Sequence, residues 1–233
     1  MLPSDFLTNS LASQRSNILK TFKRLTQRAA TLPEPLTSKI IEKYGKDPFL
    51  ILISCLLSLR NRDTVTYPVC EKLFSYAQTP EQFLSMPLST LEHLIKSVNF
   101  YRRKAHLLHT VSQQIIDQFK GRVPHTAEQL STLPGVGPKT ISLVLDQAFG
   151  KPSICVDTHV QKISERLGWV TTKDPVKTQA VLEKIFPKKY WSKINEVLVK
   201  WGQNRCKKTA DTCPFHDLCI RIYPVKTTLK TRR

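Results

Sequence analysis

Glycine, acidic residues and long apolar runs are all scarce in this sequence. Each shortage narrows the structures or the partners that the chain is expected to have. With only 7 glycines in 233 residues, two glycines close together need a specific explanation. The longest apolar run covers residues 48–59. It is shorter than the roughly 18 residues that span a bilayer, so a buried core helix is expected and no membrane span. No run alternates between apolar and polar residues as a half-buried strand does, and the sequence therefore predicts an all-α protein.

The shortage of acidic residues leaves a large positive charge. Lysine and arginine number 36 against 18 aspartates and glutamates, which gives a formal net charge of +18 and a pI near 9.8. Because solubility alone does not require so basic a chain, the composition predicts a polyanionic partner. Nucleic acid is the first candidate and an anionic membrane surface the second.

Six cysteines do not form the pattern of a secreted, disulfide-bonded domain. Cys55, Cys70 and Cys155 are isolated, and the other three lie close together near the C-terminus. So few and so unevenly spaced cysteines are typical of a reducing compartment.

The first 32 residues predict a basic amphipathic helix, because Ile18, Phe22 and Leu25 fall at helical spacing among basic residues. A mitochondrial transit peptide has the same basic, acid-poor character and is the alternative. A linker at residues 32–35 follows. Further helices are predicted at residues 40–44, 48–59 and 64–76, and capping-box spacing marks helix starts at Thr79 with Gln82, Ser89 with Glu92, and Thr126 with Gln129.

Two of the scarce glycines, Gly135 and Gly137, lie one residue apart between helical segments at 127–133 and 140–149. Glycines there permit backbone angles closed to other residues and let a ligand approach the main chain. The amides from Gly135 to Lys139 are expected to point outward at the positive end of the second helix, where they suit a backbone phosphate. The pattern indicates a helix-hairpin-helix motif, with a plain tight connection between packed helices as the alternative.

Lys139 lies in the first turn of the second predicted helix, where the helix dipole disfavours a cation. A purely structural lysine would be oddly placed there, whereas a nucleophilic lysine suits the position. At the reference pKa of about 10.4, the neutral amine is disfavoured at pH 7 by roughly 4.6 kcal/mol. The helix end and partial burial are both expected to reduce that penalty.

Asp157 precedes Val160, Ile163 and Leu167, which recur at helical spacing, so its plain interpretation is a helix cap. A functional role is compatible with capping. If the chain folds this carboxylate back towards Lys139, it would stabilise positive charge that develops on a substrate and assist proton transfer.

The stretch LPGVGPKT at 133–140, followed by VDTH at 156–159, resembles the signature of the endonuclease III superfamily of base-excision DNA glycosylases. That signature combines a helix-hairpin-helix with a Gly/Pro-rich loop and an aspartate. Three more blocks recur in the family's order, and the resemblance extends over residues 36–223. These blocks lie at 56–58, 99–105 and 121–124.

The resemblance implies two helical domains with a DNA-binding cleft between them, across which Lys139 and Asp157 would face each other. One domain would be a six-helix barrel that carries the hairpin, and the other would combine both ends of the chain. The implied boundaries are residues 37–150 for the barrel with the hairpin at 127–149, residues 1–36 and 151–223 for the second domain, and residues 224–233 for a basic tail.

The resemblance also implies a bifunctional enzyme of base-excision repair that acts on damaged double-stranded DNA, with oxidised pyrimidines as the expected bases. Lys139 would attack C1′ of a nucleotide turned out of the duplex while Asp157 stabilises the cationic sugar. The Schiff base that results would permit β-elimination at the abasic site. Two alternatives remain: a monofunctional adenine or mismatch glycosylase, and a non-enzymatic DNA-binding protein that uses the same hairpin.

Arg60 departs from the family pattern, because many members carry at this position a glutamine that fills the gap left by the flipped nucleotide. A guanidinium stacks on bases and donates hydrogen bonds, so it would still fill such a gap. An exposed phosphate contact is the alternative role. The candidate DNA-binding residues are Arg60, Gly135, Val136, Gly137 and Thr140.

The clustered cysteines match the family's metal pattern only in part. Around a [4Fe-4S] cluster that pattern is C-x6-C-x2-C-x5-C, whereas Cys206, Cys213 and Cys219 supply three thiols. Three outcomes stay open: a cluster completed by His216 or another group, a zinc site of the Cys3His type, or no metal.

A monomer in a reducing compartment that holds DNA is expected. That compartment would be the cytoplasm with its nucleoid in a bacterium, or the nucleus or mitochondrion in a eukaryote. The acid-free tail at 226–233 would add non-specific attraction to DNA.

Overall fold

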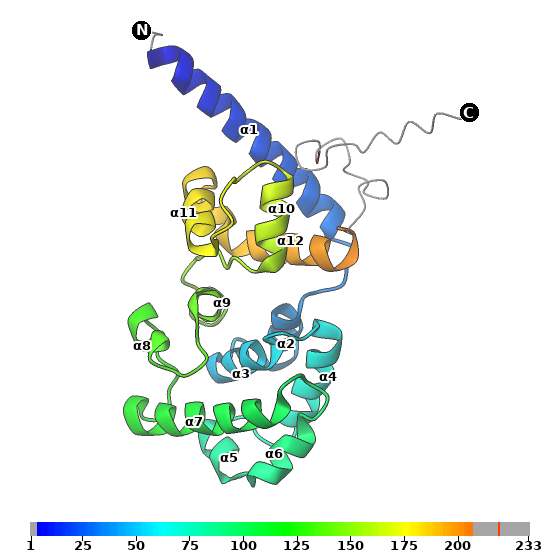
Figure 1. The fold of residues 1–233 in the computed structure, drawn as a ribbon, viewed down its shortest axis with the longest axis vertical. Helices are drawn as coiled ribbons and strands as arrows, with labels where there is room; N and C mark the ends of the chain where they lie inside the picture. Colours follow the sequence, from blue (N-terminus) through cyan, green and yellow to red (C-terminus); the bar gives the residue numbers. More distant parts are fainter. Residues whose placement is uncertain (1–3, 207–218, 220–233) are drawn as a thin grey trace, which may run out of the picture. The chain divides into compact units, whose positions relative to one another are not determined.

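The computed structural model describes residues 4–206 and residue 219, with side chains described from residue 14. These residues form twelve α-helices and one short 3-10 helix, and no strand occurs among them, which confirms the all-α prediction. Their contacts divide the chain into two compact units, one of residues 34–155 and one of residues 1–33 with 156–233 (Figure 1). No helix in the described part is long and apolar enough to cross a membrane.

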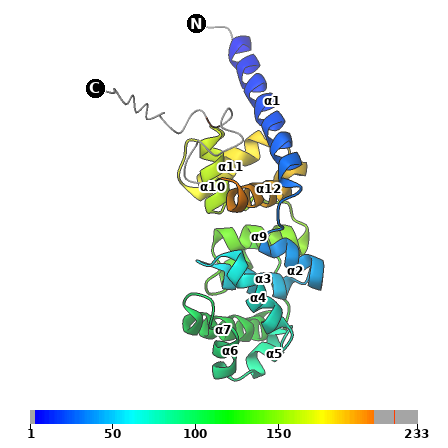
Figure 2. The same ribbon diagram turned by 90° about the vertical axis from the view of Figure 1, so that its right-hand side faces the viewer.

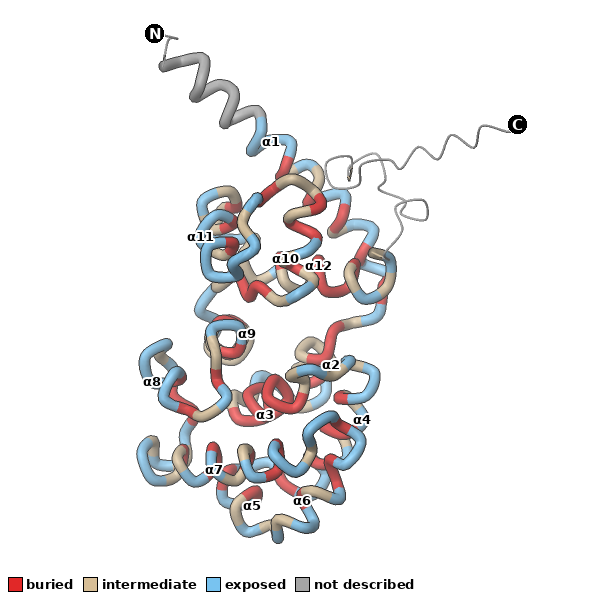
Figure 3. The backbone as a smooth tube through the Cα atoms, viewed as in Figure 1, coloured by how far each residue is buried: buried red, intermediate tan, exposed pale blue. Residues whose placement is uncertain are grey.

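The unit of residues 34–155 is built around α3, the apolar run noted in the sequence. Asp47 caps α3 by accepting a hydrogen bond from Leu50 N–H, and the helix is buried from Phe49 to Leu57 (Figure 3). Helices α2, α4, α7 and α9 all pack against it. The elements of this unit are α2 (Leu36–Tyr44), α3 (Pro48–Ser58), α4 (Asp63–Phe74), α5 (Pro80–Ser85), α6 (Leu88–Leu94), α7 (Tyr101–Phe119), α8 (Ala127–Ser131) and α9 (Pro138–Phe149).

This unit extends a few residues beyond the range 37–150 that the family resemblance implied, at both ends. Local contacts explain the difference. Leu36 is buried in the core of the unit. After α9, Lys151 Nζ donates to His125 O at 2.6 Å and Cys155 Sγ donates to Lys139 O at 3.5 Å. These bonds hold the segment 151–155 on the same unit as the hairpin.

Two of the three predicted capping signals are confirmed and one is wrong. Thr79 forms a complete capping box, and Thr126 accepts from the backbone N–H three residues further on. By contrast, Pro87 occupies the N-cap position of α6 with an extended ψ of 136°, so Ser89 lies within the first turn and caps nothing.

The second unit buries the apolar face of α1 (Ser4–Ala29), as predicted. Ile18, Phe22 and Leu25 are all buried, and the Phe22 ring lies 5.2 Å from that of Phe186 in edge-to-face contact. Both α1 and α10 pack against α12 (Figure 2). The other elements are α10 (Thr158–Arg166), α11 (Pro175–Ile185), a 3-10 helix η1 (Lys188–Tyr190) and α12 (Trp191–Asn204).

The contact of α10 with α12 depends on one glycine. A Cβ placed on Gly202 of α12 would meet the His159 imidazole, with Cγ at 2.7 Å and Cβ at 2.9 Å. The clash reaches the root of the side chain, so a small rotation of the ring does not relieve it. A side chain at residue 202 would therefore push α10 and α12 apart. Helix α10 begins directly after Asp157, and α12 ends shortly before Cys206.

We predict that Gly202→Ala lowers the free energy of unfolding, by up to about 2 kcal/mol. Overpacking costs about 1–3 kcal/mol, and the better helix propensity of alanine returns at most about 1 kcal/mol. Urea unfolding measures the change. In a His159→Ala background the loss should shrink, and a Gly202→Ala protein more stable than the wild type would contradict the packing argument.

Candidate active site

The hairpin between α8 and α9 uses its two glycines differently. Gly135 has φ of +75°, a backbone that favours glycine, and a Cβ on it would lie 2.9 Å from Leu107 Cδ2, the end of a side chain that would have to shift. Gly137 has φ of −97° and open space around it. The prediction that both glycines adopt angles closed to other residues is therefore correct for Gly135 only, and Gly137 instead serves as the N-cap of α9.

The sequence predicted that the amides from Gly135 to Lys139 point outward together. In the structure only some of them do. Val136 N–H donates to Leu133 O at 3.2 Å, and its side chain is buried in the core. Pro138 has no N–H, and the first bond back into the helix runs from Ile141 N–H to Gly137 O at 3.0 Å. The donors suited to an anion are therefore those of Gly137 and of the first turn of α9.

No side chain among the described residues caps the start of α9. The amides of Lys139 and Thr140 precede the first helical bond of α9 and lie at the positive end of its dipole. Thr140 is itself buried, with 3% of its surface exposed, so the accessible residues at this helix start are Gly137, Pro138 and Lys139. The helix start is left open for an anion.

Lys139 is the second residue of α9, as predicted, but it is exposed rather than partly buried. The expectation of partial burial was therefore wrong. Lys139 instead lies exposed at the positive end of the α9 dipole, beside the first backbone donors of the helix.

Asp157 caps α10, which confirms the structural part of its prediction. Its Oδ1 accepts hydrogen bonds from His159 N–H at 2.9 Å and Val160 N–H at 2.8 Å. Within the described part of the chain, Oδ2 accepts none. Because two main-chain donors fix the half-buried carboxylate through one oxygen, the other oxygen keeps a defined direction and its lone pairs.

Arg60 and Phe100 form a pair of exposed side chains on two neighbouring turns. The Arg60 guanidinium carbon lies 5.8 Å from the centre of the Phe100 ring, and 54% of the Phe100 surface is exposed. Both residues have left-handed backbones, with φ of 59° and 60°. The sequence singled out Arg60 but not its aromatic neighbour.

Lys104 is a buried cation that sequence reasoning missed. Its Nζ donates to Leu57 O at 2.6 Å and to Leu59 O at 2.8 Å, at the C-terminal end of α3. Burial lowers the pKa of this ammonium to about 8. The signal was available, because Lys104 occupies the same helical stripe as the core residues Leu108 and Val111, where a lysine is unusual.

The isolated cysteines, Cys55, Cys70 and Cys155, are all buried in the unit of residues 34–155. Burial raises the pKa of Cys55 to about 12, against the lowering effect of the Lys139 charge. Burial likewise raises the pKa of Cys70. Cys55 and Cys70 therefore act as small apolar residues and not as nucleophiles.

The predicted metal ligands are described only in part. Cys206 Sγ accepts a hydrogen bond of 2.7 Å from Arg166 Nη1, and Cys213 and His216 lie outside the described residues. Among residues 4–206 and 219, no three or more His, Cys, Asp or Glu side chains come together as metal ligands. The three cysteines of the sequence remain one short of the four-thiolate pattern.

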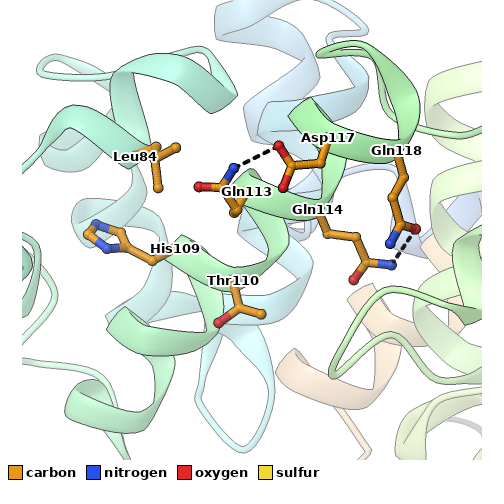
Figure 4. A pocket seen from close by; sticks show the side chains of 7 residues that line it. All are labelled: Leu84, His109, Thr110, Gln113, Gln114, Asp117 and Gln118. Atoms are coloured by element: carbon orange, nitrogen blue, oxygen red, sulfur yellow. Dashed lines mark hydrogen bonds between the residues drawn. The ribbon is translucent and has the colours of Figure 1, made fainter.

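Two surface grooves lie away from the hairpin lysine. One, of about 430 Å³, follows the outer face of α7, where the amides of Gln113 and Gln114 bond to residues one turn ahead (Figure 4). The other, of about 480 Å³, lies between the starts of α3 and α5 and residues 121–125. Lys139 lines neither groove, and the polar groups of the first are largely paired with each other.

Comparison with known proteins identifies the relatives of this chain. The profile of the HhH-GPD superfamily base excision DNA repair proteins matches residues 53–188. Endonuclease III of Thermotoga maritima is 40% identical over 185 residues, which cover 77% of this chain and 87% of that protein. Endonuclease III of Bacillus subtilis is 37% identical over 182 residues, covering 76% and 83% respectively.

Solved structures agree with these relatives. A non-covalent Endonuclease III–DNA complex superposes with a TM-score of 0.78 at 32% identity, covering 88% of this chain and 94% of the other. A trapped Endonuclease III–DNA covalent intermediate gives 0.76 at 31% identity, covering 88% and 95%. With the hairpin and the capped aspartate in place, the chain belongs to the HhH-GPD superfamily of base excision DNA repair proteins.

Proposed function

We propose that this chain is a DNA glycosylase and abasic-site lyase that acts on damaged duplex DNA, with oxidised pyrimidines as its substrates. The observation that carries the proposal is Lys139, an exposed primary amine in the first turn of a helix whose N-terminal amides no side chain caps. Similarity to a trapped Endonuclease III–DNA covalent intermediate supports covalent chemistry for this amine.

The proposed reaction starts with the neutral amine of Lys139. Its Nζ forms a bond to C1′ of the extruded nucleotide, the glycosidic bond breaks, and the base leaves with the electron pair and takes up a proton. Opening of the sugar ring then gives a Schiff base between Nζ and C1′. Loss of a proton from C2′ expels the 3′ phosphate, and the strand is cut on the 3′ side of the abasic site.

Asp157 supplies negative charge for this sequence. The sugar becomes cationic as the glycosidic bond breaks, and a carboxylate fixed by two main-chain donors stabilises that charge without having to reorient. Its Oδ2 is the oxygen available for this interaction and for proton transfer. A single carboxylate thus caps α10 and serves the chemistry.

In this proposal, three features bind DNA, and they act over different distances. The net charge of +18 attracts the polyanion from a distance. The open start of α9 binds one backbone phosphate and sets the register. Arg60, exposed beside Phe100, contacts the duplex near the displaced nucleotide.

The cysteine segment has no step in the proposed reaction. Cys206, Cys213 and Cys219, with His216 as a further donor, are the residues that would hold a metal. Their set is one thiolate short of the family's four-cysteine pattern. A metal held there would join the end of the chain to its own unit and stabilise the fold.

We predict that Lys139→Gln abolishes both base release and borohydride trapping on abasic DNA. The substitution removes the amine but only one positive charge among many, so binding of duplex DNA should stay close to that of the wild type. Trapping is measured by a shift of the protein–DNA band on a denaturing gel. If the variant still cross-links, another amine forms the Schiff base.

We predict that Asp157→Asn and Asp157→Ala both slow base release by a hundredfold or more, about 2.7 kcal/mol, in single-turnover assays. The two variants differ in stability. Asparagine keeps the cap, whereas alanine loses about 1 kcal/mol of unfolding free energy. Near-wild-type rates in Asp157→Asn would reduce Asp157 to a helix cap.

We predict that Cys213→Ser leaves the rate of trapping by folded protein close to that of the wild type, because no step uses the cysteines. Iron, zinc and sulfide analysis is done on both proteins in parallel. If the wild type carries a metal, the variant should lose it and unfold at lower temperature. Loss of trapping in a folded variant would show that the segment takes part in the chemistry.

A further inference from the structure

Two turns of the unit of residues 34–155 carry strained residues side by side. In the described part of the chain, three residues other than glycine have a positive φ, and two of them are Arg60 and Phe100. A left-handed backbone costs about 1–2 kcal/mol at such residues and persists only where the surroundings enforce it. Something must therefore hold both turns in this conformation.

Hydrogen bonds link the two turns directly. Asn99 N–H donates to Asn61 Oδ1 at 2.8 Å, and Asn99 Nδ2 donates to Arg60 O at 2.8 Å. The carbonyl of Arg60 is thus fixed by the turn that presents Phe100. The side chains of Arg60 and Phe100 come together from these two turns, with the guanidinium carbon 5.8 Å from the ring centre.

Lys104 and Asn61 bind the same two carbonyls beneath the turns. Asn61 Nδ2 donates to Leu57 O at 2.9 Å and to Leu59 O at 3.2 Å, the two groups that also accept from Lys104 Nζ. Lys104 is only 6% exposed, on a helix that begins immediately after Phe100. One buried ammonium therefore links the end of α3 to the start of α7.

We propose that Lys104 is a positioning residue for DNA recognition, and that its ammonium, with Asn61 and Asn99, fixes the backbone that presents Arg60 and Phe100 to the duplex. The proposal rests on the proposed function in one respect, which is that Arg60 contacts DNA.

An apolar side chain at residue 104 would fill the same space but would donate no hydrogen bonds to the carbonyls of Leu57 and Leu59. A buried ammonium is costly unless several acceptors surround it, and here burial lowers its pKa to about 8. Methionine at residue 104 would avoid that cost but would leave Asn61 as the only side chain on the two carbonyls. What the lysine adds is a second donor that fixes the end of α3. Arg60 directly follows Leu59, one of the two residues whose carbonyls the lysine binds.

The test measures binding to a duplex that contains a tetrahydrofuran abasic-site analogue, which needs no chemistry. We expect Lys104→Met to weaken this binding roughly tenfold, within the range found for coupled residues of one network. In an Arg60→Ala background, Lys104→Met should have no further effect, because the group that it positions is gone. Lys72→Met, which removes an exposed charge from α4, is the matched control and should weaken binding less.

A second variant keeps the proposal testable if Lys104→Met does not fold. Asn99→Ala removes the donor to Arg60 O from an exposed position, and it should weaken binding in the wild type but not in the Arg60→Ala background. Wild-type affinity in both variants, equal effects with and without Arg60, or an Arg60→Ala protein that binds normally would each overturn the proposal. Failure of the proposed function would appear separately, as absence of Lys139-dependent trapping.

Discussion

Unpaired backbone groups at helix ends govern where this protein is able to bind and react. The start of α9 has no side-chain cap, Pro138 supplies no N–H there, and Val136 N–H is already bonded inward. What remains is a small set of outward donors at the positive end of the helix, next to the amine of Lys139. The same turn that offers donors suited to a phosphate also carries an exposed amine. In the proposed reaction, phosphate binding and amine chemistry therefore depend on the same helix start.

The opposite situation holds at the end of α3. Its last carbonyls carry partial negative charge, and they are satisfied by the Lys104 ammonium and the Asn61 amide. Because α3 is buried along most of its length and packs against α9, one core helix supports both the hairpin and the turn that carries Arg60. The apolar run that excluded a membrane span is thus the platform for the proposed DNA contacts.

The sequence allowed prediction of the features that depend on local pattern. Helical periodicity and the two spaced glycines placed Lys139 in the first turn of a helix, and the position of Asp157 before an apolar stripe predicted its cap. The predictions that the Val136 amide points outward and that Lys139 is partly buried were wrong. Both features depend on how the turn packs on the core. The network of Lys104 joins residues more than forty positions apart in the sequence, and no spacing rule predicts such contacts.

In the proposed reaction, Asp157 serves both stability and chemistry. A helix cap needs only one acceptor oxygen, and Oδ1 accepts both main-chain N–H groups. The second oxygen is then held at a fixed angle by bonds that the fold requires in any case, so its orientation costs little additional entropy. Lys139 differs, because its long side chain is exposed and only its backbone is fixed. The carboxylate is therefore preorganised for the proposed reaction, whereas the exposed Lys139 amine is not fixed by bonds within the described part of the chain.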